Sequence, residues 1–158
     1  MKLELKSTSQ KSSHALAGAN IRRELKDKWP DQKFSVRSKS YSGGDSVDVD
    51  WNNGPTDKEV HEIINKYQEG SFDGMIDLYT HSHTEFNNLY GGAKYVFGQR
   101  NIDESTIRDV WEAIQEACNV VTDKYHETRQ ALRTVSLYHK TKFVGIDISS
   151  GQIVAVFE

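Results

Sequence analysis

The chain has 158 residues, 36% of them hydrophobic, 10% aromatic and 27% charged, and its net charge is −3; this suits one folded domain and argues against a disordered chain. Its one cysteine excludes an internal disulfide, and no apolar run approaches the roughly 18 residues of a transmembrane helix. The first residues lack the apolar core of a signal peptide, so we expect a cytoplasmic protein without a membrane partner.

The charge is distributed unevenly along the chain. Residues 1–45 hold ten Lys or Arg and five Asp or Glu, a net charge of +5, so the remaining residues carry −8. A basic front and an acidic back indicate an oriented surface field that would attract a charged partner. An ordinary solvated surface explains the same pattern, and both interpretations stay open.

The first predicted helix begins after Ser12 or Ser13, either of which can cap it, and ends before Pro30, which cannot continue a helix. A β-hairpin is predicted next, because Phe34 and Val36 alternate with polar residues before a turn over 41–45. The apolar positions that support these two predictions are Leu16 or Ala17, Ile21, Leu25 and Trp29 in the helix, and Val47, Val49 and Trp51 in the second strand.

A second predicted helix opens at a capping box of Thr56 and Glu59, and Gly70 is its predicted stop. Residues 76–92 show no clear periodicity. A short strand is predicted over 94–97, with Tyr95 and Phe97 on one side and Val96 on the other.

The C-terminal third predicts a long helix that starts at Asp103 or Ser105, with helical character through Leu132 and Val135. A break near residues 122–123 stays open, and a hairpin of residues 143–148 and 153–157 follows. The fold class is therefore α+β, with a helix–β-hairpin–helix unit, a further strand, a long C-terminal helix and a terminal β-hairpin. We expect the long helix to pack on the sheet and the terminal hairpin to extend it. We also expect one domain over 1–158, with a core over 14–102 and an extension over 103–158.

The hairpin region is distinctive in sequence. Residues 33–49 read KFSVRSKSYSGGDSVDV, residues 51–56 read WNNGPT, and the helix before them contains IRRELK at 21–26. FDGMID at 72–77 and GAKYVF at 92–97 with Arg100 follow. This succession resembles the large polyvalent protein-associated domain 29 family over roughly residues 14–102.

The resemblance implies the kind of protein in which such a domain occurs, but it does not imply a chemical reaction. It implies a module of the large multidomain proteins that phages and conjugative elements carry, which travel with the invading DNA and protect it or manipulate the bacterial host. It implies no catalytic residue, and it does not cover the C-terminal third.

The strongest functional feature of the sequence is a set of basic residues. Helical periodicity places Arg22, Arg23 and Lys26 on the exposed side of the first helix, and strand alternation places Arg37 and Lys39 on the exposed face of the hairpin. A joint patch would attract phosphates with little base specificity. Whether the two sets point the same way stays open. Tyr41 at the hairpin tip is a candidate stacking platform for a single strand.

The turn around Gly43 and Gly44 could bind an anion through its backbone N–H groups, although a plain hairpin turn is the favoured interpretation. The carboxylates of Asp48 and Asp50 could hold Mg²⁺, although alternating acids are typical of an outward strand face.

The best metal candidates are His81 and His83, which point the same way in an extended chain and have Asp77 and Glu85 nearby. A polar loop is the favoured interpretation of this segment. Cys118 lies on the apolar stripe of the long helix and is interpreted as a buried structural thiol. No Ser–His–Asp arrangement is supported by sequence alone.

The leading hypothesis is a non-enzymatic accessory binding protein of a phage or mobile element, with counter-defence as one role, that contacts nucleic acid or a host defence protein. One alternative is a small metal-dependent hydrolase or nuclease that uses His81, His83 and nearby carboxylates. Another is a module that binds a nucleotide or other small anion at the SGGDS turn. We expect no cofactor, and the oligomeric state stays open.

Overall fold

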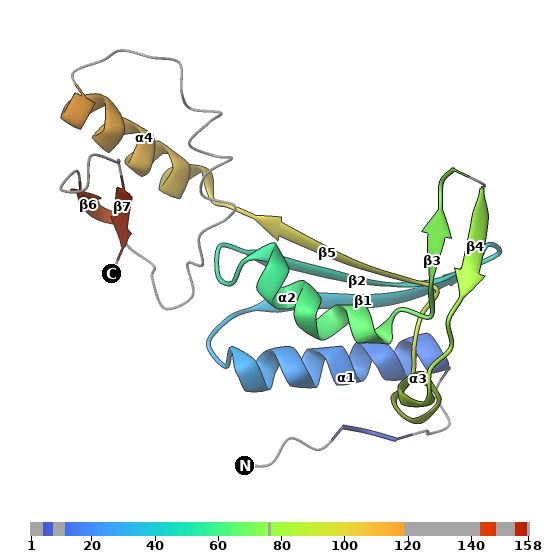
Figure 1. Cartoon of the computed structure of the whole chain (residues 1–158). Helices are drawn as coiled ribbons and strands as arrows, with labels where there is room; N and C mark the ends of the chain where they lie inside the picture. Colours follow the sequence, from blue (N-terminus) through green and yellow to red (C-terminus); the bar gives the residue numbers. More distant parts are fainter. Residues whose placement is uncertain (1–4, 8–11, 76, 119–142, 148–153, 158) are drawn as a thin grey trace. The chain divides into compact units, whose positions relative to one another are not determined.

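The computed structural model describes residues 5–7, 12–75, 77–118, 143–147 and 154–157 (Figure 1). The described chain is α+β, as the sequence predicts. It divides into two compact units, Met1–Trp51 with Lys58–Gln99 and Asn52–Asp57 with Arg100–Glu158. No helix within the described ranges is long and apolar enough to cross a membrane.

The first unit is built around a helix, a hairpin and a returning strand. Its elements are α1 (Ser13–Lys28), β1 (Phe34–Tyr41), β2 (Gly44–Asn52), α2 (Asp57–Ile64), the 3₁₀ helix η1 (Asn65–Tyr67), β3 (Gly70–Asp73), β4 (Leu78–His81), α3 (Glu85–Tyr90) and β5 (Tyr95–Asn101).

The predicted first helix and hairpin are confirmed. Helix α1 begins directly after Ser12 and buries its predicted apolar stripe, with Ile21 and Leu25 fully buried. Strands β1 and β2 pair antiparallel, with Tyr41 opposite Gly44 at the turn and Phe34 opposite Trp51 at the far end. This register puts Val47, Val49 and Trp51 in the core, as the alternation predicts.

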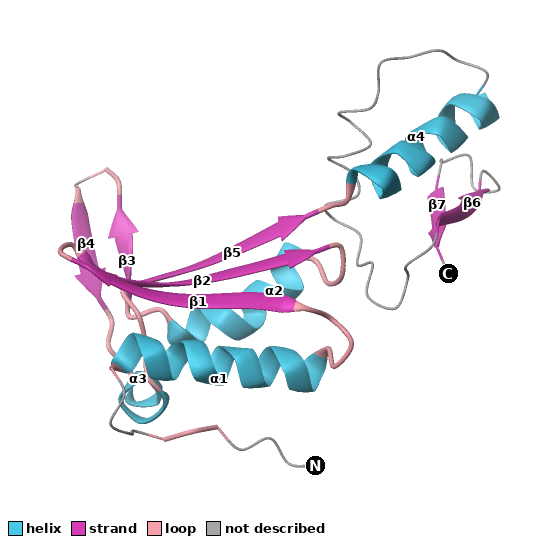
Figure 2. Ribbon diagram, turned by 180° about the vertical axis from the view of Figure 1, so that it is seen from behind, coloured by secondary structure: helices cyan, strands magenta, loops and turns pink. Residues whose placement is uncertain are grey.

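A three-stranded sheet with the order β1-β2-β5 forms the centre of the first unit. Helix α1 packs on β1, and α2 packs close to β5, because a Cβ at Gly98 would lie 2.8 Å from His61 Cε1 and 3.1 Å from Ile64 Cδ1. Both helices lie on the same face of the sheet, and β5 runs in the same direction as β2 (Figure 2). Neither of these two helices therefore covers the other face of the sheet (Figure 2).

A buried asparagine on α1, Asn20, bonds to two other segments of this unit, the N-terminal segment and the end of α3. Asn20 is fully buried, and its Nδ2 donates to the carbonyl oxygens of Lys6 (2.8 Å) and Tyr90 (2.9 Å). Its Oδ1 accepts from the Lys6 N–H at 2.8 Å. One side chain thus holds both the N-terminal segment and the end of α3 against α1, with every polar atom satisfied.

A buried acid holds η1 against the same helix. Glu24 is 9% exposed; its Oε1 accepts from the Tyr67 hydroxyl and its Oε2 from the Lys66 ammonium, each at 2.5 Å. Burial raises the pKa of Tyr67 far above its usual value, and the hydrogen bond to Glu24 and the charge of Glu24 raise it further. The phenol is therefore a donor across the whole neutral and moderately alkaline range.

This environment predicts an alkaline loss of stability. Below pH of about 10 Tyr67 is protonated in the folded and unfolded chains alike. Above that pH only the unfolded chain releases the proton, so the free energy of unfolding falls by up to about 1.4 kcal/mol per pH unit for this group. Urea unfolding at pH 9, 10 and 11 should show a shallower fall in Tyr67→Phe than in the wild type. Parallel slopes would contradict the assignment.

Two details of the region after α2 differ from the sequence expectations. The helix ends at Ile64 and η1 at Tyr67, so the prediction of Gly70 as the helix stop is wrong. Gln68 is already extended, and Gly70 begins β3 at φ +149°, where a Cβ would lie 2.2 Å from the Thr80 carbonyl oxygen. Close strand approach, and not helix termination, therefore requires this glycine. The unassigned segment 76–92 contains β4 and α3.

The second unit contains α4 (Glu104–Cys118), β6 (Phe143–Asp147) and β7 (Val154–Phe157). The terminal hairpin is confirmed as an antiparallel pair, but the prediction that it extends the main sheet is wrong, because β6 and β7 form a two-stranded sheet of their own. Alternation predicts a strand and its two faces but not its neighbours. Helix α4 contacts β6. The expected continuation of the long helix through Leu132 and Val135 lies outside the described residues.

Arg100 organises the start of the second unit. It is 3% exposed, and its guanidinium donates to the carbonyl oxygens of Asn53 (2.7 Å) and Gly54 (3.0 Å). Both Asn53 and Gly54 have backbone φ angles near +50°. Asn53 also donates to the Asp103 carboxylate at 2.7 Å. The WNNGPT turn and Arg100, which are far apart in the sequence, thus form one structural element.

Candidate nucleic-acid interface

The face of the main sheet opposite α1 and α2 carries polar and aromatic side chains. On β1 and β2 the apolar residues of the alternation point to the helices, so the residues between them point away. On β5, Val96 is 5% exposed and Phe97 is 54% exposed, as the sequence predicts. We call this surface the open face; it comprises Arg37, Lys39, Asp48, Asp50, Tyr95, Phe97 and Gln99.

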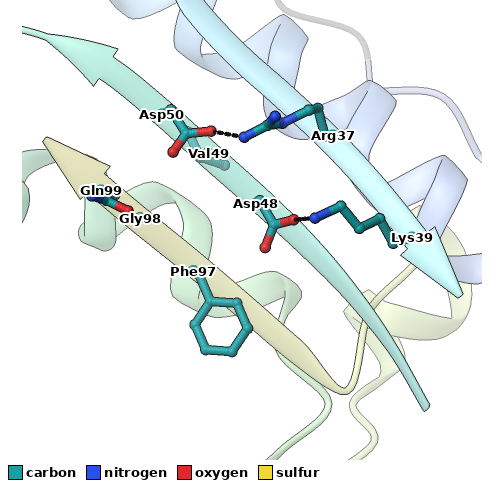
Figure 3. A pocket seen from close by; sticks show the side chains of 8 residues that line it. All are labelled: Arg37, Lys39, Asp48, Val49, Asp50, Phe97, Gly98 and Gln99. Atoms are coloured by element: carbon teal, nitrogen blue, oxygen red, sulfur yellow. Dashed lines mark hydrogen bonds and ion pairs between the residues drawn. The ribbon is translucent and has the colours of Figure 1, made fainter. Parts of the chain in front are cut away.

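The basic residues of the open face are paired with acids. Arg37 NH2 lies 2.6 Å from Asp50 Oδ2, and Lys39 Nζ lies 2.8 Å from Asp48 Oδ2 (Figure 3). Both pairs run diagonally between β1 and β2, because Arg37 lies opposite Asp48 in the register. The two charge pairs cancel, so these four residues give the face no net charge. Asp48 and Asp50, which the sequence suggested for Mg²⁺, thus have cations as neighbours.

A groove of about 560 Å³ runs between these pairs and β5. The two ion pairs line one side, and Phe97, Gly98 and Gln99 line the other (Figure 3). Gly98 contributes only its backbone to the groove, because a Cβ at this position would point to His61 and Ile64 on the other face of the sheet. The walls of the groove therefore combine a polar side with an aromatic side.

Four rings in contact continue the open face from β5 to β4. The planes of Tyr95 and Phe97 are within 9° of parallel, with centroids 5.9 Å apart. Tyr79 meets Tyr95 edge-on at 5.5 Å, and His81 meets Tyr79 edge-on at 4.7 Å. We call these four residues the aromatic row. Neighbouring rings restrict one another, so the row is a preorganised surface for planar groups.

Lys94 supplies a cation to this row. Its ammonium lies 5.0 Å from the Tyr79 ring centroid and 5.4 Å from that of Tyr95, within the range of cation–π attraction. The same ammonium donates to the Gly43 carbonyl oxygen at 2.9 Å. The Tyr79 hydroxyl donates to the Lys94 carbonyl oxygen at 2.5 Å. Desolvation raises the pKa of Tyr79, and the neighbouring Tyr95, Glu69 and Asp45 raise it further, so its hydroxyl stays protonated.

The structure does not bring the two predicted basic sets onto one face. Arg22, Arg23 and Lys26 are exposed on α1, which covers the face of the sheet opposite to Arg37 and Lys39. Arg22 reaches the edge of the sheet, where its guanidinium donates to the Val36 carbonyl oxygen at 2.5 Å. The helix cations thus form a surface separate from the open face.

The predicted anion-binding turn lies at the tip of the β1–β2 hairpin. Gly44 has φ +142°, and a Cβ there would lie 2.6 Å from Lys94 Cδ, so the Lys94 side chain crosses the turn at this glycine. The ring of Tyr41, 47% exposed, lies beside Gly43. The turn therefore presents a lysine and a tyrosine together with its backbone groups.

The two candidate metal-binding histidines have different surroundings. His81 belongs to the aromatic row, whereas His83 lies between Glu69 Oε1 (3.4 Å) and Asn88 Oδ1 (2.7 Å). Among the residues that the structure describes, no group of three His, Cys, Asp or Glu is placed to hold a metal ion. Cys118 is the last residue of α4, and its side chain lies outside the described part of the chain.

Sequence reasoning missed the aromatic row. Tyr79 and His81 lie two residues apart in a segment without clear periodicity, and their meeting with β5 depends on how the β3–β4 hairpin folds back. The available signal was the alternation of Tyr95 and Phe97 against Val96, which already placed two rings on one side of a strand.

Comparison with protein families gives one result. The family model described as large polyvalent protein associated domain 29 matches residues 12–105. That match covers α1 to the start of α4, and so the whole open face and the aromatic row. No curated protein and no solved structure matches the chain significantly.

Proposed function

The chain belongs to the large polyvalent protein associated domain 29 family, a domain of phage and mobile-element polyvalent proteins, and on that premise we propose that it is an accessory module that binds single-stranded nucleic acid on its open face. The observation that carries the proposal is the aromatic row, with Phe97 54% exposed and Lys94 above two of its rings. In this setting, binding would shield the element's own strand from host defences.

Stacking supplies most of the affinity in this proposal. A base that lies on an aromatic ring contributes about 1–3 kcal/mol, and every base has such a face. Tyr95 and Phe97 present nearly parallel rings on one strand, and the exposed ring of Phe97 offers surface against which a base can stack. Double-stranded nucleic acid hides these base faces, so the proposal specifies single strands.

Electrostatics contributes less, because the open-face cations are already paired. Arg37 and Lys39 each have a carboxylate within 2.8 Å, and a phosphate would have to compete with it. Lys94 is the cation nearest to the row. We therefore expect a shallow salt dependence, with a slope of log affinity against log salt of about −1 to −2.

The binding prediction concerns Phe97→Ala. Because the ring is exposed and most of its surface is available for a base, we expect this variant to bind a labelled 12-nucleotide single strand about tenfold more weakly than the wild type. Fluorescence anisotropy at several salt concentrations measures both the affinity and the salt slope, which should stay unchanged.

Leu89→Ala is the matched control, since Leu89 is an exposed apolar residue (44%) on α3, outside the aromatic row. Its affinity should equal that of the wild type. If Phe97→Ala binds as well as the wild type while Arg22→Ala/Arg23→Ala loses affinity, the site lies on α1. If no single strand binds even at low salt, a host protein becomes the partner to pursue.

A further inference from the structure

A second cluster of side chains lies where α1 begins beside the start of β2. Ser12 Oγ lies 3.3 Å from His14 Nε2, and His14 Nδ1 lies 3.3 Å from Asp45 Oδ2. The other oxygen of Asp45, Oδ1, accepts from the backbone N–H of Lys94 at 2.7 Å. None of these three side chains belongs to the open face or to the aromatic row.

From this order of atoms we propose that Ser12, His14 and Asp45 form a nucleophile–base–carboxylate triad that hydrolyses carboxylic esters through an acyl-Ser12 intermediate. The triad is recognised by the geometry and the roles of its members and not by sequence order. Distances somewhat above 3 Å between nucleophile and base are common in ligand-free sites.

The two histidine nitrogens have the partners that these roles require. A proton on Nδ1 points to the Asp45 carboxylate, which fixes the ring and stabilises the imidazolium that forms during reaction. This tautomer leaves the lone pair of Nε2 directed to the Ser12 hydroxyl. The backbone bond from Lys94 in turn holds the carboxylate in place.

The position of Ser12 suits a nucleophile. It is the N-cap residue of α1 with an extended backbone, yet its side chain makes no capping hydrogen bond and contacts His14 instead. Ser12 is exposed, whereas the side chains of His14 and Asp45 are only 17% and 28% exposed. The N–H groups of the first turn of α1 have no acceptor within the helix, so they can donate to an oxyanion formed beside Ser12.

The proposed reaction needs only the ester and water. Ser12 Oγ forms a bond to the carbonyl carbon while its proton passes to His14 Nε2. The bond from that carbon to the alcohol oxygen then breaks, and the alkoxide takes the proton from Nε2. Water attacks the acyl carbon and gives a proton to Nε2; the Oγ–carbon bond breaks and Oγ recovers the proton. The products are one carboxylic acid and one alcohol.

The test is covalent labelling of the whole folded chain with a fluorophosphonate, followed by peptide mass spectrometry, together with hydrolysis of 4-nitrophenyl acetate. We expect the label on Ser12, and we expect both rates to fall at least about 100-fold in Ser12→Ala and His14→Gln. Asp45→Asn keeps an acceptor for the Lys94 N–H and should also lose most of the rate.

Ser42→Ala is the control, because Ser42 is an exposed serine in the nearby hairpin turn, and it should label as the wild type does. The melting temperature of Ser12→Ala should stay near that of the wild type, since no capping bond is lost. Labelling of Ser12 no faster than in heat-denatured protein, or equal labelling in His14→Gln, overturns the proposal. Neither result affects the nucleic-acid proposal, whose test variant Phe97→Ala lies on β5.

Discussion

Replacing Gly91 with alanine is expected to destabilise the first unit by about 3 kcal/mol or more. Gly91 follows the last residue of α3 at φ +83°, a backbone conformation that residues with a side chain rarely adopt. A Cβ at this position would lie 2.5 Å from the Ser13 carbonyl oxygen and 2.7 Å from the Ala17 nitrogen.

Both of these atoms belong to the backbone of α1, so no side-chain rotation relieves the clash. Either α3 or the first turn of α1 has to move, and this movement also strains the hydrogen bond from Asn20 to the Tyr90 carbonyl. Urea unfolding measures the effect. Gly43→Ala is the control, because a Cβ there meets only the Tyr41 ring at 3.5 Å. A Gly91→Ala variant as stable as Gly43→Ala would contradict the packing described for α3.

The second large effect is expected for Glu24→Ala, at about 3 kcal/mol of lost unfolding free energy. The substitution removes the acceptor of the fully buried Tyr67 hydroxyl and the partner of the Lys66 ammonium at once. An unsatisfied buried donor costs its full desolvation free energy, whereas the half-exposed lysine can recover water. Most of the loss therefore comes from Tyr67.

Glu24→Gln separates the two contributions, because glutamine still offers an oxygen to Tyr67 but no charge to Lys66. We expect it to lose about half as much unfolding free energy as Glu24→Ala. Glu62→Ala, on the exposed side of α2, is the surface control and should stay within about 0.5 kcal/mol of the wild type. If Glu24→Ala behaves like Glu62→Ala, the buried pair does not hold η1 to α1.

Local patterns predicted α1, β1, β2, α2 and β5 of the first unit but not β3, β4 and α3. The i, i+4 stripe of α1 and the alternation in β1, β2 and β5 each follow from one face meeting the core. Gly70 was misinterpreted because the sequence does not distinguish a glycine that ends a helix from a glycine that allows two strands to approach closely. Strand partners depend on contacts far apart in sequence, and so the separate sheet of β6 and β7 was missed.

The candidate sites also depend on contacts between residues that are far apart in the sequence. The sequence identified Arg37 and Lys39 as outward cations, but their neutralisation by Asp50 and Asp48 depends on the cross-strand register. The aromatic row requires β4 to meet β5, and the proposed triad requires Asp45 to meet the start of α1. In each case the residue types were visible in the sequence, while their meeting is a property of the tertiary fold.

The family is established over residues 12–105. The proposal of single-strand binding is supported by the exposed, ordered rings of the aromatic row. The proposal of ester hydrolysis is supported by the contacts of Ser12, His14 and Asp45 beside the start of β2. The substitutions that test the two proposals lie at different residues, Phe97 for strand binding and Ser12, His14 and Asp45 for ester hydrolysis, so each proposal can be tested on its own.

Photo-crosslinking tests the central proposal most directly. A single-stranded oligonucleotide that contains 5-bromouracil should, on irradiation with the wild-type chain, form adducts on Tyr95, Phe97 or Tyr79, because halogenated bases react with the aromatic rings on which they stack. Peptide mass spectrometry would identify the modified residue, and Phe97→Ala should give less product. Adducts confined to α1, or no adduct under conditions in which the strand is bound, would contradict the assignment of the open face.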